Sequence, residues 1–125
     1  MDKLIIHRNK AWWGQSLTLI LNGGIAFGLV SREHQSPQIA VIGGLSVIQE
    51  KQGKGWGNKI LEACENEAMA LGGVEKLLIY AEKDDFTASW YERHGYKPIP
   101  WVNDGHLIAL EKDVSPDNAR NQDGR

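Results

Sequence analysis

The sequence predicts an α+β fold (three-layer α/β), in which helices flank a mixed, mostly antiparallel sheet. Asn22-Gly23-Gly24 lies between two runs rich in β-forming residues, residues 17–21 and 25–30, which is a strong hairpin signal. A third apolar run, Ile39–Val47, precedes a glycine-rich loop and a segment with helical periodicity. Another apolar run follows that helix, so the two runs predict one parallel pair of strands with a right-handed crossover.

Length and composition place the chain among ordinary globular proteins. It has 125 residues, of which 42% are hydrophobic and 24% are charged, as expected for one domain. We expect this domain over residues 1–114 and a polar, solvated tail over residues 115–125. The net charge of −2 and the scattered Lys and Arg residues argue against a nucleic-acid partner.

The cysteine content and the apolar runs indicate the compartment. Cys64 is the single cysteine, so an internal disulfide is excluded, and its place on an apolar helix face predicts a packed core residue. No apolar run has the length of a membrane span, and residues 1–10 lack the apolar core of a signal peptide. We therefore expect a cytoplasmic protein that does not contact a membrane.

The first segment, residues 2–15, has two interpretations. Its apolar residues 4–6 either begin a strand or join Trp12 and Trp13 on a short helix. The two strands of the hairpin come next, and residues 31–38 predict a polar turn before the third strand.

The third strand, residues 38–47, has an unusual interior because it contains Gly43-Gly44. Glycine weakens a strand, since it loses more backbone entropy on folding and has no side chain to pack. The pair therefore indicates either a β-bulge or a close approach by a ligand.

Gly53, Gly55 and Gly57 precede a helix that we expect to begin at Asn58. Glycines let a backbone adopt positive φ, so that successive N–H groups can point at one place. That place is the positive end of a helix dipole, which suits a phosphate group. A Gly-Gly pair closes the helix. The apolar face of the helix consists of Ile60, Leu61, Cys64, Ala68 and Leu71.

Two common phosphate-binding motifs fail on spacing. A dinucleotide-binding G-x-G-x-x-G counted from Gly53 requires a glycine where Asn58 stands. A Walker loop requires G-K-[ST], but Lys54 is followed by Gly55. The loop is therefore either another class of phosphate site or an ordinary glycine turn.

The C-terminal half predicts a strand, a helix and two further strands. Residues 75–81 read as a buried strand. Asp84 or Asp85 is expected to cap the second helix, which Gly95 ends. Prolines in the first of the closing strands restrict it to a sheet edge or end it early. The closing strands are expected at residues 96–99 and 107–111.

Three motifs in register resemble the GNAT acetyltransferase superfamily across residues 39–97. Gln52-x-x-Gly55-x-Gly57 is similar to its [QR]-x-x-G-x-[GA] loop signature. Upstream, the L-S-V run at residues 45–47 resembles the L-x-V that ends the family's fourth strand, and residues 88–96 resemble its A-x-x-L-Y-E-K-x-G-F segment. The resemblance implies a GNAT-like acyl-CoA N-acyltransferase fold, in which the parallel pair of strands splays apart.

The resemblance also implies acetyl-CoA (coenzyme A) as a co-substrate, held mainly by backbone groups. The end of the third strand would face the pantetheine amides, and the loop N–H groups would hold the pyrophosphate. An aspartate, Asp84, stands where many members carry an asparagine that contacts the cofactor, and it is equally suited to be only a helix cap. The implied cofactor-binding residues are Leu45, Ser46, Val47, Gln52, Gly53, Lys54, Gly55, Trp56, Gly57, Asn58 and Asp84.

Tyr91 matches the family tyrosine that lies close to the thioester sulfur, which implies a catalytic role. A phenol there can protonate or stabilise the leaving thiolate; the alternative is a core aromatic residue. Because Cys64 is assigned to the core, we expect direct attack by a primary amine in a ternary complex. The histidines show no metal-ligand spacing, so no metal site is expected.

The N-terminal region is too short for the two helices that form part of the family's acceptor site. We expect an amine-bearing small molecule or a peptide as the acceptor. The alternative function is a non-catalytic acyl-CoA-binding or interaction module. The missing helices would also leave an apolar surface bearing Trp12 and Trp13, which predicts a homodimer.

No residue of Ile39–Val47 can accept a proton from the acceptor. Several family members carry a glutamate where Val41 stands. An alkyl ammonium with a pKa of about 10.4 cannot attack until it is deprotonated. We expect the proton to pass to water or to Glu33, His34 or His106.

Overall fold

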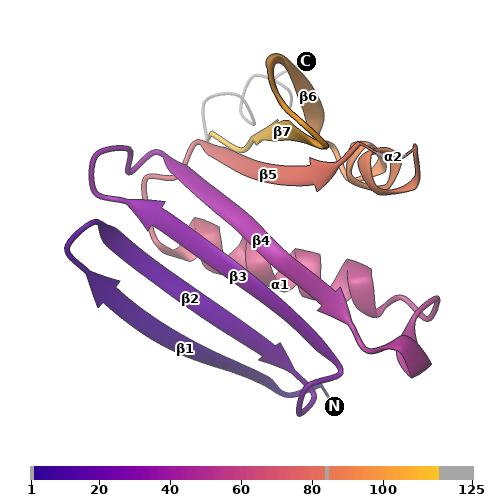
Figure 1. The fold of residues 1–125 in the computed structure, drawn as a ribbon. Coiled ribbons are helices and arrows are strands. Elements are labelled where there is room, and N and C mark those ends of the chain that lie inside the picture. Colours follow the sequence, from indigo (N-terminus) through magenta and orange to yellow (C-terminus); the bar gives the residue numbers. More distant parts are fainter. Residues whose placement is uncertain (1, 84, 116–125) are drawn as a thin grey trace, which may run out of the picture.

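The computed structural model describes residues 2–83 and 85–115. The sheet in this part of the chain has the strand order β1-β2-β3-β4-β5-β7-β6, and neighbouring strands are antiparallel except β4 and β5. This confirms the predicted α+β fold with a mixed, mostly antiparallel sheet. The elements are β1 (Leu4–Ala11), β2 (Gly14–Leu21), β3 (Ala26–Glu33), β4 (Ile39–Val47), a 3₁₀ turn (Gln49–Lys51), α1 (Trp56–Ala70), β5 (Lys76–Glu82), α2 (Asp85–Arg93), β6 (Lys97–Asp104) and β7 (Leu107–Asp113) (Figure 1).

The N-terminal segment is a strand, so its helical interpretation is wrong. β1 pairs along its whole length with β2. The two strands are joined only by a tight turn at Trp12 and Trp13, and the Trp13 carbonyl accepts a hydrogen bond from the His34 N–H at 2.9 Å. The chain therefore passes directly from β1 to β2, without the helices that the family's acceptor site would require.

The predicted hairpin at Asn22-Gly23-Gly24 connects β2 to β3. All three residues have positive φ, with values of 48°, 71° and 113°. Asn and Gly tolerate this region of backbone conformation better than other residues do. The Asn22 side chain also accepts a hydrogen bond from the Lys3 N–H at 2.6 Å, which fixes the turn to the start of β1.

β4 contains the predicted bulge and then diverges from β5. The register of β3 and β4 shifts between the pair Phe27–Ser46 and the pair Leu29–Gly43, so β4 has one extra residue there. Gly44 has a φ of +59°, as expected for a bulge of this kind. The parallel pairing with β5 ends at Ile42, before the bulge. The C-terminal part of β4 is therefore free on the side that would face β5.

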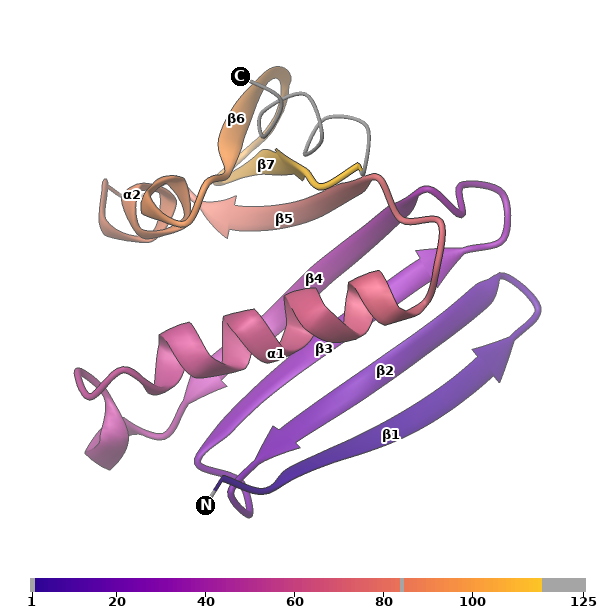
Figure 2. The same cartoon turned by 180° about the vertical axis from the view of Figure 1, so that it is seen from behind.

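α1 begins at Trp56, two residues earlier than predicted. Gly55, with a φ of +87°, is its N-cap, and Gly57 thus lies inside the first turn. The helix packs across one face of β2, β3 and β4 (Figure 2). At its C-terminal end the Arg32 guanidinium donates hydrogen bonds to the carbonyls of Leu71 and Gly72. This contact satisfies carbonyl groups that a helix end leaves unpaired.

Gly28 permits the close approach of α1 to β3. It is buried in the middle of β3, and a Cβ placed there would collide with Cys64 Sγ and lie 3.0 Å from Leu45 Cδ2 and 3.3 Å from Ile60 Cγ1. Cys64 is fully buried, as predicted for a core residue. The core between sheet and helix therefore depends on a residue without a side chain at this position.

The C-terminal half agrees with the predicted elements, with one correction. β5 was expected to be buried throughout, but Tyr80 is 53% exposed because burial alternates along this strand. β6 lies at the edge of the sheet, as expected from Pro98, and it is longer than predicted. α2 ends at Arg93, just before Gly95 with its φ of +97°.

A polar network ties α1 to the C-terminal strands. The Tyr96 hydroxyl donates a hydrogen bond to Glu65 Oε2 at 2.7 Å, and Lys112 Nζ lies 3.2 Å from the same oxygen. Tyr96 is almost completely buried, and this burial together with the Glu65 carboxylate raises the pKa of its phenol. Tyr96 therefore remains a neutral donor to Glu65.

The face of the sheet opposite α1 carries no helix over β1, β2 and β3 in the described part of the chain (Figures 1 and 2). We call this surface the open face. Its apolar centre includes Ile5, Phe27 and Leu29, whose exposed fractions are 49%, 37% and 45%. An exposed apolar patch of this kind is unusual on a monomer.

We expect Gly28→Ala to lower the free energy of unfolding by about 1–3 kcal/mol, because the added methyl group overpacks the core against Cys64. Urea unfolding measures this change. The matched control is Gly43→Ala, because a Cβ at that strand position meets no atom within 4 Å. Cys64→Ala in the Gly28→Ala background removes the colliding sulfur and should recover part of the loss. An unfolding free energy equal to that of the parent would contradict this account of the α1 packing.

Candidate active site

A cleft of about 630 Å³ opens where β4 separates from β5. One wall is formed by the end of β4, the glycine loop and the first turns of α1, and the other wall is formed by α2. The lining residues on the first wall are Leu45, Ser46, Val47, Gln52, Gly53, Gly55, Gly57, Asn58 and Ile60, and those on the second wall are Phe86, Thr87, Trp90 and Tyr91.

The loop between β4 and α1 is shaped by a side chain and by two glycines. Gln52 Nε2 donates a hydrogen bond to the Val47 carbonyl at 3.1 Å, which folds the loop back on the strand end. Gly53 and Gly55 have φ values of +79° and +87°, and a Cβ at either position would meet no atom within 4 Å. The space beside both residues is therefore open for a ligand.

The first turn of α1 presents backbone donors to this space. The first N–H groups of a helix have no partner within the helix, and the helix dipole makes this end positive. Trp56, Gly57 and Asn58 occupy the first three positions of α1, after the Gly55 N-cap. The arrangement fits an anionic group such as a pyrophosphate.

Gly57 has a different role from the other two loop glycines. Its φ is not positive, and a Cβ there would lie 3.4 Å from Cζ2 of Trp90. The Trp90 ring therefore lies close to the first turn of α1. The sequence pattern did not reveal this contact, because Trp90 is distant along the chain.

Tyr91 lies on the α2 wall among aromatic side chains. Its ring makes edge contacts with Trp90 and Tyr96, with centroid distances of 5.1 and 6.0 Å. The side chain is half-buried, and this burial raises the pKa of the Tyr91 phenol. The hydroxyl is therefore protonated at neutral pH and is able to donate a hydrogen bond into the cleft.

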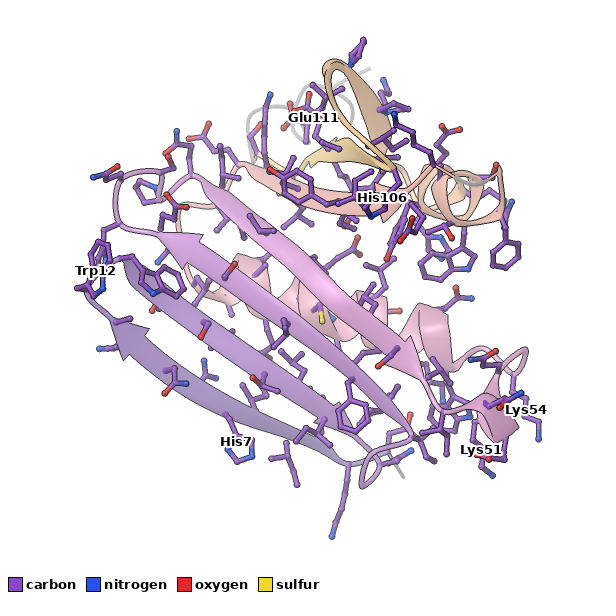
Figure 3. All side chains as sticks on the ribbon, in the orientation of Figure 1. His7, Trp12, Lys51, Lys54, His106 and Glu111 are labelled. Carbon is purple, nitrogen blue, oxygen red and sulfur yellow. The ribbon has the colours of Figure 1, made fainter. Side chains whose placement is uncertain are left out.

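Some of the residues expected at the site lie elsewhere. Lys54 and Trp56 do not line the cleft, and Lys54 points outward from the loop (Figure 3). Trp56 instead packs against the core, with Lys59 Nζ 4.7 Å from its ring centroid. Lys59 also pairs with Asp2 at 3.0 Å. Asp84 lies outside the described residues.

Sequence reasoning missed four lining residues, Ile60, Phe86, Thr87 and Trp90. Ile60 was assigned only to the core, where it is also fully buried. Thr87 could have been found from the helical period, because it lies four residues before Tyr91 and shares its side of α2. Phe86 and Trp90 are likewise four residues apart and share the adjacent side.

Cys64 is unsuited to be a nucleophile. Burial, reinforced by the nearby Glu65 and Glu67 carboxylates, raises the pKa of its thiol to about 12. The thiolate is the reactive form, so this residue is inert at neutral pH. In the described part of the chain, no group of three or more His, Cys, Asp or Glu side chains is arranged to hold a metal ion.

The candidate proton acceptors lie at different ends of the sheet. β3 begins opposite Val47 and ends at Glu33, so Glu33 and His34 are more than roughly 20 Å from the cleft end of β4. The expectation that either could take a proton at the site is wrong. His106 is exposed beside α2, and its carbonyl accepts a hydrogen bond from the Lys83 N–H at 2.9 Å (Figure 3).

Known structures share this fold. An acetyltransferase from Bacillus subtilis in complex with CoA has a TM-score of 0.66 at 15% identity, with 90% of this chain and 100% of that chain covered. A GNAT family acetyltransferase from Elizabethkingia anophelis with acetyl-CoA bound has a TM-score of 0.62 at 16% identity, with coverages of 91% and 100%. The PaiA N-acetyltransferase from Thermoplasma acidophilum in complex with coenzyme A has a TM-score of 0.64 at 20% identity, with coverages of 79% and 60%.

One sequence comparison, with curated proteins, found no match to the chain. No helix in the described part of the chain has the length and apolar character needed to cross a bilayer. Residues 12–98, well over half of the sequence, match the family described as the acetyltransferase (GNAT) domain. The glycine loop, the splayed β4–β5 pair and this match together show that the chain belongs to the GNAT acetyltransferase family.

Proposed function

We propose that this protein transfers an acetyl group from acetyl-CoA to a primary amine by direct attack in a ternary complex. The observation that carries the proposal is the cleft between β4 and α2, which combines backbone donors on one wall with the Tyr91 phenol on the other. Family membership supports acetyl transfer in general.

The cofactor would bind mainly through the backbone. The N–H groups around Gly55 and the first turn of α1 fit the pyrophosphate, as argued above. The free edge of β4 beyond the bulge offers strand hydrogen bonds to an extended chain that carries amides, in the manner of an added strand. The pantetheine arm is such a chain, and residues 45–47 are therefore its proposed contacts.

Tyr91 would act on the leaving group. The amine nitrogen forms a bond to the acetyl carbon while the bond from that carbon to sulfur breaks, and the sulfur leaves as a thiolate. The protonated Tyr91 hydroxyl can donate a hydrogen bond or a proton to this sulfur as negative charge develops on it. The proposed mechanism has no covalent intermediate on Cys64, because this thiol is buried and stays protonated.

The acceptor must arrive as the free amine or lose its proton in the cleft. None of the residues in β4 can take this proton, and Glu33 and His34 are too distant. We therefore propose that it passes to water or to His106, the exposed histidine beside α2. The proposed acceptor is an amine-bearing small molecule or a peptide.

One observation favours a second candidate function. Among the described residues, β1 turns directly into β2 without the helices that complete the family's acceptor site, so a non-catalytic acyl-CoA-binding module is the alternative. This alternative predicts normal acetyl-CoA binding without turnover on any amine.

We propose in addition that a second copy of the chain covers the open face. The centre of this face, Ile5, Ile20, Phe27 and Leu29, is apolar, and its neighbours on β2 are the uncharged Ser16 and Thr18. Two such faces would not repel each other electrostatically, and burying them would remove apolar surface from water.

Gly55→Ala should weaken acetyl-CoA binding at least about tenfold, because the new methyl group occupies the space proposed for the pyrophosphate. The control is Gly72→Ala at the other end of α1, where φ is +84° and a Cβ also meets no atom within 4 Å. Both variants carry the same backbone strain of about 1–2 kcal/mol, so they should be equally stable. Calorimetry of acetyl-CoA binding separates them, and equal affinity in the two variants would refute the loop assignment.

Tyr91→Phe should lower kcat at least about tenfold and leave acetyl-CoA affinity within about twofold, because the hydroxyl acts mainly in the transition state. Acetyl-CoA consumption over pools of primary amines first identifies an acceptor. Tyr80→Phe is the control, since Tyr80 is an exposed tyrosine outside the cleft. If the Tyr91→Phe enzyme had the kcat of the parent, Tyr91 would be a packed core residue without a catalytic role. Acetyl-CoA binding without consumption on any amine would favour the non-catalytic alternative.

Sedimentation should show a dimer at protein concentrations of tens of micromolar. This is about ten or more times the dissociation constant of a typical specific dimer. Leu29→Glu should convert it to a monomer, because a buried unpaired carboxylate is costly. Met69→Glu is the control, since Met69 is similarly exposed, at 39%, but lies on α1. The proposal fails if the parent protein is monomeric or if both variants dissociate it.

A further inference from the structure

His94 joins the two walls of the cleft by a hydrogen bond at each of its ring nitrogens. Nδ1 lies 2.8 Å from the carbonyl oxygen of Trp90 on α2, and Nε2 lies 2.8 Å from Oδ1 of Asn58 on α1. The imidazole also packs on the Trp90 ring, with 4.3 Å between centroids. The side chain is half-buried, and it is not among the residues that line the cleft.

The bond to Trp90 fixes the orientation of the ring. The backbone N–H of His94 donates a hydrogen bond to the Tyr91 carbonyl at 2.9 Å. It is therefore not the donor to the Trp90 carbonyl, as it would be if α2 continued. The side chain supplies the missing donor to that carbonyl. Nδ1 therefore carries a proton. In the neutral imidazole Nε2 is then an acceptor, so the Asn58 side-chain amide, with its oxygen and nitrogen exchanged, donates the second hydrogen bond.

Asn58 is the third residue of α1 and lines the cleft. Its side chain receives the imidazole contact, while its backbone N–H is one of the donors proposed for the pyrophosphate. The Trp90 ring lies beside the adjacent Gly57, where a Cβ would be 3.4 Å from Cζ2 of the ring. The first turn of α1 and the last turn of α2 therefore meet through two neighbouring residues.

We propose that His94 is a positioning residue that fixes the distance between the phosphate-binding end of α1 and the Tyr91 hydroxyl. This inference rests on the proposed function. Tyr91 follows Trp90 directly, so a shift of α2 relative to α1 moves the phenol together with the Trp90 carbonyl. A group displaced by about 1 Å loses much of its catalytic effect. The backbone donors that hold the cofactor do not depend on this bridge.

Two conservative substitutions distinguish the hydrogen bond from His94 to Asn58, which bridges the two helices, from the hydrogen bond to the Trp90 carbonyl, which caps α2. The amide nitrogen of Asn is as far along its side chain as Nδ1 of His, and the amide oxygen of Gln is as far along as Nε2. His94→Asn therefore keeps the bond to Trp90 and loses the bond to Asn58, whereas His94→Gln has the reverse effect.

We expect His94→Asn to lower kcat roughly tenfold, the size expected for one hydrogen bond, and to change the Kd of acetyl-CoA by less than about threefold. Its Tm should stay close to that of the parent. His94→Gln should keep kcat within about threefold and lower Tm instead. The probes are acetyl-CoA in calorimetry and, for kcat, the amine used for Tyr91→Phe. A residue with only a structural role would lower Tm in both variants and leave kcat of the folded enzyme unchanged.

A double substitution tests the bridge itself. Asn58→Ala should lower kcat about as much as His94→Asn, and the double variant should be no slower than either one, because all three lack the same contact. Losses that multiply would overturn the proposal, as would a His94→Asn enzyme with the parent kcat. In both cases the parent still binds and consumes acetyl-CoA, so the proposed function stands. A parent protein that binds no acetyl-CoA would overturn both.

Discussion

The separation of β4 from β5 is the constraint on which the site depends. A parallel pair would ordinarily continue its ladder to the ends of both strands, and no ligand could then enter between them. The bulge at Gly44 turns β4 away after Ile42, and the strand end beyond it has no ladder pairing with β5. Backbone groups within a fold are costly unless something satisfies them, and Gln52 Nε2 does so for the Val47 carbonyl. The cleft is therefore a place where the edge of a strand can bond a ligand.

This origin explains why the site contains so little side-chain chemistry. Strand edge and helix terminus are both backbone features, and the glycines between them matter for the conformations that they permit. Tyr91 is the exception, since its phenol is held in a protonated form by burial among Trp90 and Tyr96. On the proposed function, selectivity for the acceptor would come from the surfaces around the cleft.

Local signals predicted much of the fold, and distant contacts account for the errors. The turn at Asn22-Gly23-Gly24 and the bulge at Gly44 follow from backbone preferences that can be read over a few residues. The start of α1 was misplaced because Gly57 resembles a loop residue, whereas it lies inside the helix against Trp90. Glu33 was considered as a base because its position along β3 relative to the cleft depends on sheet register. Sequence alone does not supply contacts such as that between His94 and Asn58, since these positions meet only after α2 has docked.

The connectivity of the sheet also indicates an order of assembly. β1 to β4 form a meander in which each strand pairs with the next through a short turn, so these contacts are close in sequence. β5 reaches β4 only after the chain has passed through α1, and closing such a long loop costs entropy before any pairing compensates for it. We infer that the meander and α1 form first and that β5 to β7 add later. The cleft lies at the junction of these two parts, so ligand binding can report on the last step of folding.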